Sequence, residues 1–193
     1  MDDDRVYEIG EDFLGLDFFL IGTEGNLHRG DTPWHGAGGW DMGARSVKIA
    51  FYMDPLTRDD GCLRVIPGTH RKATPDMLDS IRYRNEDQDF RPFGLEPAAV
   101  PSVSLVSQPG DLLIFTENLL HSSFGGAPRR HQHAINFMEN PDTEKKLEDV
   151  MTLYNNANFS LRPSESYVNS DSTRVRRLVS KNLQLGFDII YGV

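Results

Sequence analysis

The first two-thirds of the 193-residue sequence consists of short β-prone runs separated by turn-forming residues. These runs are rich in branched and aromatic side chains, and turn signals at Asp59-Asp60-Gly61 and Pro109-Gly110-Asp111 precede two of them. Short strands with regular turns favour a sandwich, a barrel or a jelly roll over alternating strands and helices. We expect strands at residues 14–23, 46–54, 62–66, 103–107, 112–116 and 133–138.

The pattern changes after residue 139, where helices are expected at residues 143–154 and 172–185. A polar, charged and proline-containing insert lies between residues 70 and 100. Its middle, Pro75–Arg84, is typical of a short helix capped by Thr74, and the rest resembles the long loops that form lids. We expect one domain over residues 1–193, with a β core at about 14–138 and a helical region at 143–193.

The balance of charges excludes several classes of partner. Twenty Lys and Arg against 29 Asp and Glu give a net charge of −9, which argues against nucleic acid polymers and anionic membranes. No apolar run approaches the roughly 18 residues of a membrane span, and the acidic start lacks signal-peptide features. Cys62 is the single cysteine, which excludes an internal disulfide and fits a reducing compartment, so we expect a cytoplasmic protein.

Two of the six histidines stand in contexts that suggest chemistry. His35 lies in GDTPWHGAGGWD and His121 in GDLLIFTENLLHSSFGG. Their separation of 121 − 35 = 86 residues excludes a local helical zinc motif and requires two different strands. Arg129 and Arg130 follow at the start of the next β-prone run. Neutral imidazoles suit Fe(II), and a guanidinium fork suits a carboxylate.

Four segments carry a resemblance to a known family: DTPWHGA, DDGCLRVIPGTHR, GDLLIFTENLLHSSFGG and RRHQHAINF. In this order, over about residues 30–138, they resemble the phytanoyl-CoA dioxygenase family. The resemblance implies a mainly β, cupin-like double-stranded β-helix (jelly roll) with flanking helices, and Fe(II)/2-oxoglutarate-dependent chemistry with O2. It implies that His35 and His121 bind iron. It also implies that Arg130, or alternatively Arg129, binds 2-oxoglutarate with help from Ser123.

The sequence departs from the family pattern at one position. The third iron ligand is a carboxylate two residues after the first histidine, on the same face of the strand, but here that residue is Ala37. Among the enzymes that the chain resembles, this variant belongs to halogenases, in which chloride takes the vacated position. Gly36 and Ala37 would leave room for chloride. The resemblance thus implies chlorination of an unactivated C–H in specialised-metabolite (antibiotic) biosynthesis.

Three alternatives remain open. Asp31 or Asp41 could supply the missing ligand, which would make the protein a hydroxylase. The chain could instead be a catalytically inactive member that binds a ligand without metal. A misaligned motif is the third alternative, and the good match around Trp34-His35 and Gly61-Cys62-Leu63 argues against it.

No motif identifies the substrate. Arginines in the insert would suit a phosphate or carboxylate, so a free nucleotide is favoured over an amino acid, either free or tethered to a carrier protein. Only 34 residues precede His35, fewer than is usual in this family, so we expect the N-terminal helices and first strands to be reduced or missing. The candidate substrate-contact residues are Trp34, Trp40, Arg71, Arg82 and His133.

Overall fold

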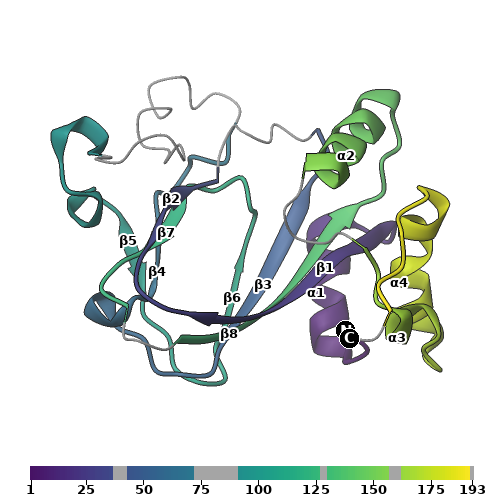
Figure 1. The fold of residues 1–193 in the computed structure, drawn as a ribbon, viewed down its shortest axis with the longest axis horizontal. Helices are drawn as coiled ribbons and strands as arrows, with labels where there is room; N and C mark the ends of the chain where they lie inside the picture. The colour runs from purple at the N-terminus through teal and green to yellow at the C-terminus, as the bar shows by residue number, and fades with distance from the viewer. Residues whose placement is uncertain (37–42, 72–90, 127–129, 157–161, 192–193) are drawn as a thin grey trace. The chain divides into compact units, whose positions relative to one another are not determined.

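The computed structural model describes residues 1–36, 43–71, 91–126, 130–156 and 162–191. Its strands form two four-stranded sheets with the orders β1-β8-β3-β6 and β2-β7-β4-β5 (Figure 1). The strands are β1 (Phe18–His28), β2 (Thr32–His35), β3 (Ser46–Tyr52), β4 (Leu63–Val65), β5 (Val103–Leu105), β6 (Leu112–Phe115), β7 (His121–Ser123) and β8 (Arg130–Glu139). The helices are α1 (Asp4–Leu14), α2 (Glu144–Asn156), α3 (Glu165–Val168) and α4 (Thr173–Gln184), with 3-10 turns η1 (Arg58–Asp60), η3 (Pro92–Gly94) and η4 (Pro97–Ala99). Two sheets and flanking helices confirm the mainly β architecture expected of a jelly roll.

The contacts divide the chain into two compact units, each discontinuous in sequence. One, the helical unit, comprises Met1–Glu24, Met42–Ile49 and Ala134–Val193. The other, the histidine unit, comprises Gly25–Asp41 and Ala50–His133 and contains all six histidines. The long strands β1, β3 and β8 contribute residues to both units. One domain over residues 1–193 stays a prediction.

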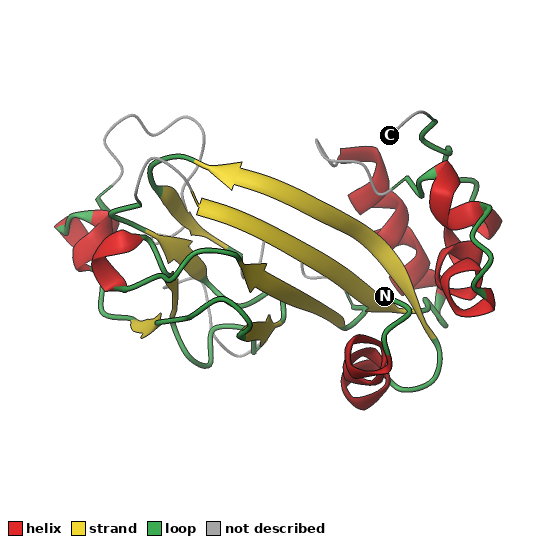
Figure 2. Cartoon of the chain, turned by 90° about the horizontal axis from the view of Figure 1, so that it is seen from below, coloured by secondary structure: helices red, strands yellow, loops and turns green. Residues whose placement is uncertain are grey.

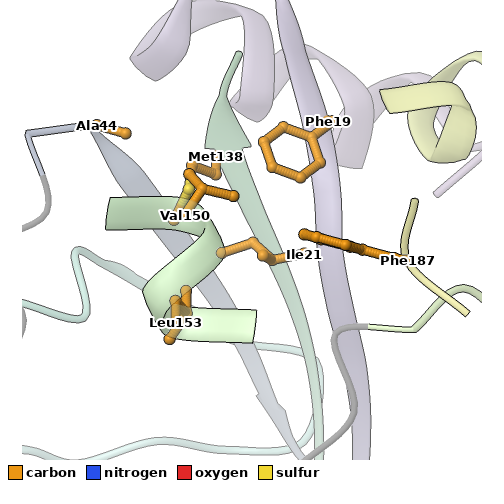
Figure 3. Packing of buried hydrophobic residues seen from close by; sticks show 7 residues of the cluster. All are labelled: Phe19, Ile21, Ala44, Met138, Val150, Leu153 and Phe187. Atoms are coloured by element: carbon orange, nitrogen blue, oxygen red, sulfur yellow. The ribbon is translucent and has the colours of Figure 1, made fainter. Parts of the chain in front are cut away.

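The strands of the helical unit carry apolar side chains on both faces, and its helices gather around one end of the long strands (Figure 2). On one face the Phe18 ring lies 5.3 Å from Tyr7 of α1 and 5.2 Å from Phe137 of β8, centroid to centroid. Because both faces are covered, four consecutive residues at the start of β1 are buried instead of alternating with exposed ones. The cluster on the other face contains Phe19, Ile21, Ala44, Met138, Val150, Leu153 and Phe187 (Figure 3).

Helix α1 begins and ends at capping residues. The Asp3 carboxylate accepts a hydrogen bond from the Arg5 N–H, and Gly15 ends the helix with a φ of 85°. Gly10 lets the helix approach β1, since a Cβ there would lie 2.5 Å from the Phe18 ring. Helix α1 and an 11-residue β1 therefore precede β2. The first strand begins at Phe18 instead of residue 14, and the expected reduction of the N-terminal elements stays a prediction.

The remaining expected elements lie within a few residues of the observed ones. The strands expected between residues 46 and 138 correspond to β3, β4, β5, β6 and β8, and the two expected helices to α2 and α4. Ser172 caps α4 by accepting a hydrogen bond from the Val175 N–H. The helix expected at Pro75–Arg84 lies outside the described residues. Among the described helices, none is long and apolar enough to cross a lipid bilayer.

A buried carboxylate ties the helical unit together. Glu139, 8% exposed, accepts hydrogen bonds from Arg45 and lies 2.9 Å from the Lys146 ammonium of α2. The Arg45 guanidinium also donates to the carbonyls of Phe13 and Leu14 at the end of α1. Burial alone would raise the pKa of Glu139, but the hydrogen bonds from Lys146 and Arg45 outweigh it and hold that pKa below its ordinary value.

Replacing Glu139 with glutamine should lower the free energy of unfolding by about 2 kcal/mol at pH 7, because charge-assisted hydrogen bonds are lost. A depressed native-state pKa stabilises the fold above the unfolded-state pKa, and this contribution disappears as the pH falls through the native value. The free energies of unfolding of wild type and Glu139→Gln, measured with urea, should therefore become equal at acidic pH. Asp142→Asn, which removes an exposed partner of Lys146, is the control and should change little. A pH-independent difference would contradict the ion-pair explanation.

Candidate functional site

The sheet β2-β7-β4-β5 of the histidine unit has an apolar layer on one face. This layer consists of Trp34, Val100, Leu120 and Phe124, with Ile66 packed against it. Because successive strand residues point to opposite faces, His35 next to Trp34 and His121 next to Leu120 point away from this layer. The apolar layer therefore fixes the strands and directs both histidines to the other face.

His35 and His121 face each other across neighbouring strands. His35 ends β2, His121 begins β7, and the two residues are partners in the antiparallel register. Their ring centroids are 4.0 Å apart. The structure thus brings together two histidines that are 86 residues apart in sequence, as the iron-site hypothesis requires.

Each imidazole is oriented by a backbone carbonyl two residues earlier. The Nδ1 of His35 lies 2.8 Å from the Pro33 carbonyl oxygen, and the Nδ1 of His121 lies 2.6 Å from that of Leu119. A carbonyl oxygen only accepts, so Nδ1 is the donor in both rings, which fits the neutral tautomer protonated at Nδ1. This tautomer is the one in which a histidine ligates a metal through Nε2.

The described residues bring together two candidate ligands and not three. Within the described ranges, no third His, Cys, Asp or Glu joins these histidines in a group able to hold a metal ion. The Asp31 carboxylate accepts a hydrogen bond from the Gly125 N–H at 2.8 Å, near the end of β2 opposite to His35. Ala37 and Asp41 lie outside the described residues.

Gly36 allows two backbone segments to approach beside the histidines. Its φ is +93°, and a Cβ there would lie 2.3 Å from the Leu119 carbonyl oxygen and 3.0 Å from the His121 Nδ1. The space that a side chain would fill is therefore occupied by the segment that orients His121. The absence of a side chain at Gly36 is needed for this packing.

Gly36→Ala should cost about 3 kcal/mol or more in the free energy of unfolding and greatly weaken metal binding, because left-handed strain adds to a backbone clash. Gly68→Ala is the matched control, since Gly68 has a φ of +85° but nothing within 4 Å of its Cβ position. Gly68→Ala should therefore lower the free energy of unfolding only by the cost of the left-handed backbone strain. Denaturant unfolding and Fe(II) titration measure the two effects, and equal losses in the two variants would contradict the role given to Gly36.

Arg130 is a buried cation at the start of β8, with only 2% of its surface exposed. Its Nη1 donates to the Gly61 carbonyl and to the Ser123 hydroxyl, both at 2.6 Å. Its Nη2 donates to the Gly30 carbonyl at 3.1 Å and to the Thr32 hydroxyl at 3.4 Å. The guanidinium thus joins β8 to β2, β7 and the residue after η1.

All four of these acceptors are uncharged. No carboxylate of the described chain forms an ion pair with Arg130, and its buried Nε has no hydrogen-bond partner there. Burial lowers the pKa of Arg130, and the negative charge of Asp31 offsets this only in part. A buried cation without a counter-ion is unfavourable, so this guanidinium is suited to binding an anionic ligand.

Glycines around Arg130 let the chain enclose the guanidinium. A Cβ at Gly61 would lie 3.2 Å from the Arg130 Nε and 2.7 Å from the Cα of Gly126. A Cβ at Gly126 would lie 2.6 Å from the Gly30 carbonyl oxygen. Three segments therefore converge on one side chain, which fixes its direction.

The spacing between the histidines and Arg130 suits a short dicarboxylate. His121 and Ser123 are two residues apart on β7, so they share a face and are separated by about 6.8 Å along the strand. Ser123 contacts Arg130 directly. A ligand with one end at the histidines and a carboxylate at Arg130 therefore has to span about one pleat repeat.

A second group of polar side chains was missed by the sequence analysis. Gln132 follows Arg130 by two residues and shares its face of β8. Its amide oxygen accepts from His28 Nε2 at 2.8 Å and from Asn26 at 3.4 Å, and its amide nitrogen donates to the Tyr52 hydroxyl at 3.3 Å. The two-residue period from Arg130 could have identified Gln132, whereas nothing in the sequence singles out His28.

Several expected substrate contacts are not near the histidine pair. Trp34 is fully buried in the apolar layer, where its indole donates to the Pro97 carbonyl at 2.9 Å, and its expected contact with a ligand stays a prediction. His133 is exposed on the face of β8 opposite to Arg130, and the structure does not bring the two together. Arg71 is exposed at the edge of the undescribed segment. The described residues do not include Trp40, Arg82 and Arg129.

Sequence comparison gives one family and one short match. Residues 19–131, more than half of the chain, match the model of the family "Phytanoyl-CoA dioxygenase (PhyH)". "Dioxygenase lolE1" from Epichloe uncinata is 31% identical over 75 residues, which cover 39% of this chain and 25% of that protein. The match thus spans only a quarter of this curated relative.

Solved structures share the fold at low identity. HygX from Streptomyces hygroscopicus, with nickel and 2-oxoglutarate bound, superposes with a TM-score of 0.55 at 16% identity, over 90% of this chain and 69% of HygX. EvdMO1 superposes with a TM-score of 0.54 at 21% identity, over 72% of this chain and 31% of EvdMO1. AviO1 from Streptomyces viridochromogenes Tue57 superposes with a TM-score of 0.53 at 16% identity, over 74% of this chain and 60% of AviO1. These likenesses support the two-sheet fold.

Proposed function

Because the chain belongs to the phytanoyl-CoA dioxygenase family, we propose that it is a non-haem Fe(II)/2-oxoglutarate-dependent oxygenase. The observation that carries this proposal is Arg130, a buried guanidinium without a carboxylate partner in the described chain, about one strand repeat from two facing histidines. In both imidazoles Nδ1 lies beside a backbone carbonyl oxygen, so Nε2 is the nitrogen suited to binding a metal.

The residues present fit both the metal and the cosubstrate. His35 and His121 would hold Fe(II) through Nε2, and Arg130 with Ser123 and Thr32 would hold the distal carboxylate of 2-oxoglutarate. The bound iron would use O2 to convert 2-oxoglutarate to succinate and CO2 and to attack a substrate C–H. Arg130 is preferred over the neighbouring Arg129 because its guanidinium already reaches Ser123.

Within this family we propose chlorination in place of hydroxylation. The residue two positions after His35 is Ala37, whose methyl group cannot ligate a metal. Chloride would take the position that a carboxylate holds in a hydroxylase. Carbonyl oxygens of Leu119 and Glu117 occupy the Cβ side of Gly36 and would repel an anion there.

Hydroxylation is the second candidate, and Asp41 is the residue that favours it. Asp41 follows His35 by six residues, and the glycines between them would allow the chain to turn back toward the iron. Asp31 is less suited, because its carboxylate is engaged with the Gly125 N–H. An inactive ligand-binding protein is the third candidate.

For the substrate we propose a free small molecule of specialised metabolism, with a nucleotide favoured on the arginines of the insert. An amino acid, free or on a carrier protein, is the alternative. No nucleic acid polymer or membrane is needed as partner, given the net charge of −9. Stimulation of 2-oxoglutarate consumption by a panel of both substrate classes would separate them.

Anaerobic titration tests the cofactor assignment. Fe(II) and 2-oxoglutarate together should produce the visible charge-transfer band of a chelated 2-oxo acid. Absence of the band and of metal uptake would exclude both enzymatic proposals and leave the binding protein. Product masses with and without chloride then distinguish C–Cl from C–OH formation.

A further inference from the structure

A second buried arginine lies on the opposite face of the small sheet from the histidines. Arg64 of β4 is 5% exposed, and its strand partner Ser122 adjoins His121 on β7. Its guanidinium carbon lies 5.4 Å from the centroid of the Phe124 ring. Like Arg130, it forms no ion pair with a carboxylate of the described residues, and its Nε has no partner among them. Its hydrogen bonds go to the backbone of two separate turns.

The first turn carries an acceptor of Arg130. Arg64 Nη2 donates to the Arg58 carbonyl at 2.9 Å, at the beginning of η1. The turn closes on itself through hydrogen bonds from the Asp60 and Cys62 N–H groups to Thr57. The residue directly after η1 is Gly61, whose carbonyl accepts a hydrogen bond from Arg130 at 2.6 Å. Arg64 therefore holds one side of the turn whose other side receives Arg130.

The second turn supports the strand of the first histidine. Arg64 Nη1 donates to the Ala98 carbonyl at 2.8 Å in η4. The carbonyl before it, that of Pro97, accepts from the Trp34 indole at 2.9 Å. Trp34 directly precedes His35 on β2. One buried side chain thus links the turn at the anion anchor to the turn that fixes the histidine strand.

We propose that Arg64 is a positioning residue for the cosubstrate anchor, and that it holds η1 so that Gly61 fixes the direction of the Arg130 guanidinium. This inference rests on the proposed function, since it concerns the same site. Arg64 contacts neither metal nor cosubstrate. Its loss should therefore weaken ligands with a distal carboxylate more than ligands that only chelate the metal.

The variant Arg64→Met tests this proposal. Methionine keeps apolar volume beside Phe124 but removes the two donors, Nη1 and Nη2. Dissociation constants for 2-oxoglutarate and for pyruvate, which chelates metal but lacks the distal carboxylate, are measured on the Fe(II)-loaded protein under anaerobic conditions. We expect about tenfold weaker 2-oxoglutarate binding and a much smaller change in pyruvate binding. Arg91→Met, at an exposed arginine before η3, is the matched control and should change neither. Arg64→Lys should fall between, and replaces the methionine variant if that variant does not fold.

Three results would overturn the inference: unchanged 2-oxoglutarate affinity, equal weakening of both ligands, or an Arg64→Met effect that persists in an Arg130→Gln background. A readout without ligand separates it from the proposed function. In the metal-free protein, the Arg130 Nε–H should exchange with solvent about tenfold faster in Arg64→Met than in wild type, and equal rates would overturn the inference. If wild type binds no 2-oxoglutarate, the proposed function fails and this exchange rate alone decides the role of Arg64.

Discussion

Arg130→Gln should weaken 2-oxoglutarate binding by about 100- to 1,000-fold, equivalent to about 3–4 kcal/mol. The guanidinium is buried and meets only neutral acceptors in the described chain, so the ligand carboxylate would be its counter-ion. Glutamine removes the charge and the two-pronged geometry together. The cosubstrate carboxylate would then be desolvated without compensation. The dissociation constant follows from the anaerobic charge-transfer band.

Two further variants make this prediction specific. His131→Ala changes the neighbouring residue on the exposed face of β8 and should leave 2-oxoglutarate affinity unaltered. Arg130→Lys retains the charge but not the fork, so a substantial loss is expected there too. Fe(II) affinity should stay close to wild type in all three variants, because His35 and His121 keep their carbonyl partners. Normal 2-oxoglutarate binding by Arg130→Gln would transfer the anchor role to another residue.

The strands β1, β3, β4, β5, β6 and β8 were predictable because local chemistry determines them, whereas β2 and β7 were not among the predicted strands. Runs such as residues 46–54 alternate and end at turn residues, and the observed β3 lies within that run. Helix α1 was missed although Asp3 and Gly15 are ordinary capping residues. The burial of both faces of β1 depends on α1 and α2, so no period-two signal marked where the strand begins.

The site divides in the same way between local and non-local information. Motifs identified His35, His121 and Arg130, since each lies in a recognisable segment. Trp34 packs into the apolar layer because successive strand residues point to opposite faces, so the residue next to His35 lies on the other face of the sheet. Hydrogen bonds between residues more than 100 positions apart, such as His28 with Gln132, exist only after the sheet has formed. Composition alone cannot identify such pairs.

Ala37 is important because it stands two residues after His35, where the family pattern has the carboxylate ligand. Ala37→Asp would place a carboxylate where chloride is proposed to bind. We expect chlorination to fall to background, hydroxylated product to replace it, and Fe(II) to bind about tenfold or more tightly through a third protein ligand. Product masses in chloride-containing buffer and Fe(II) titration measure these changes.

Ala37→Gly is the control for this substitution, because it keeps the position free of a ligand and should retain chlorination. Continued chlorination by Ala37→Asp would place the halide elsewhere on the iron. Hydroxylation by wild type, lost in Asp41→Asn and restored by adding Ala37→Asp, would identify Asp41 as the native third ligand and the protein as a hydroxylase. Since a carboxylate and a chloride compete for one coordination position, these variants assign that position to Ala37, to Asp41 or to neither.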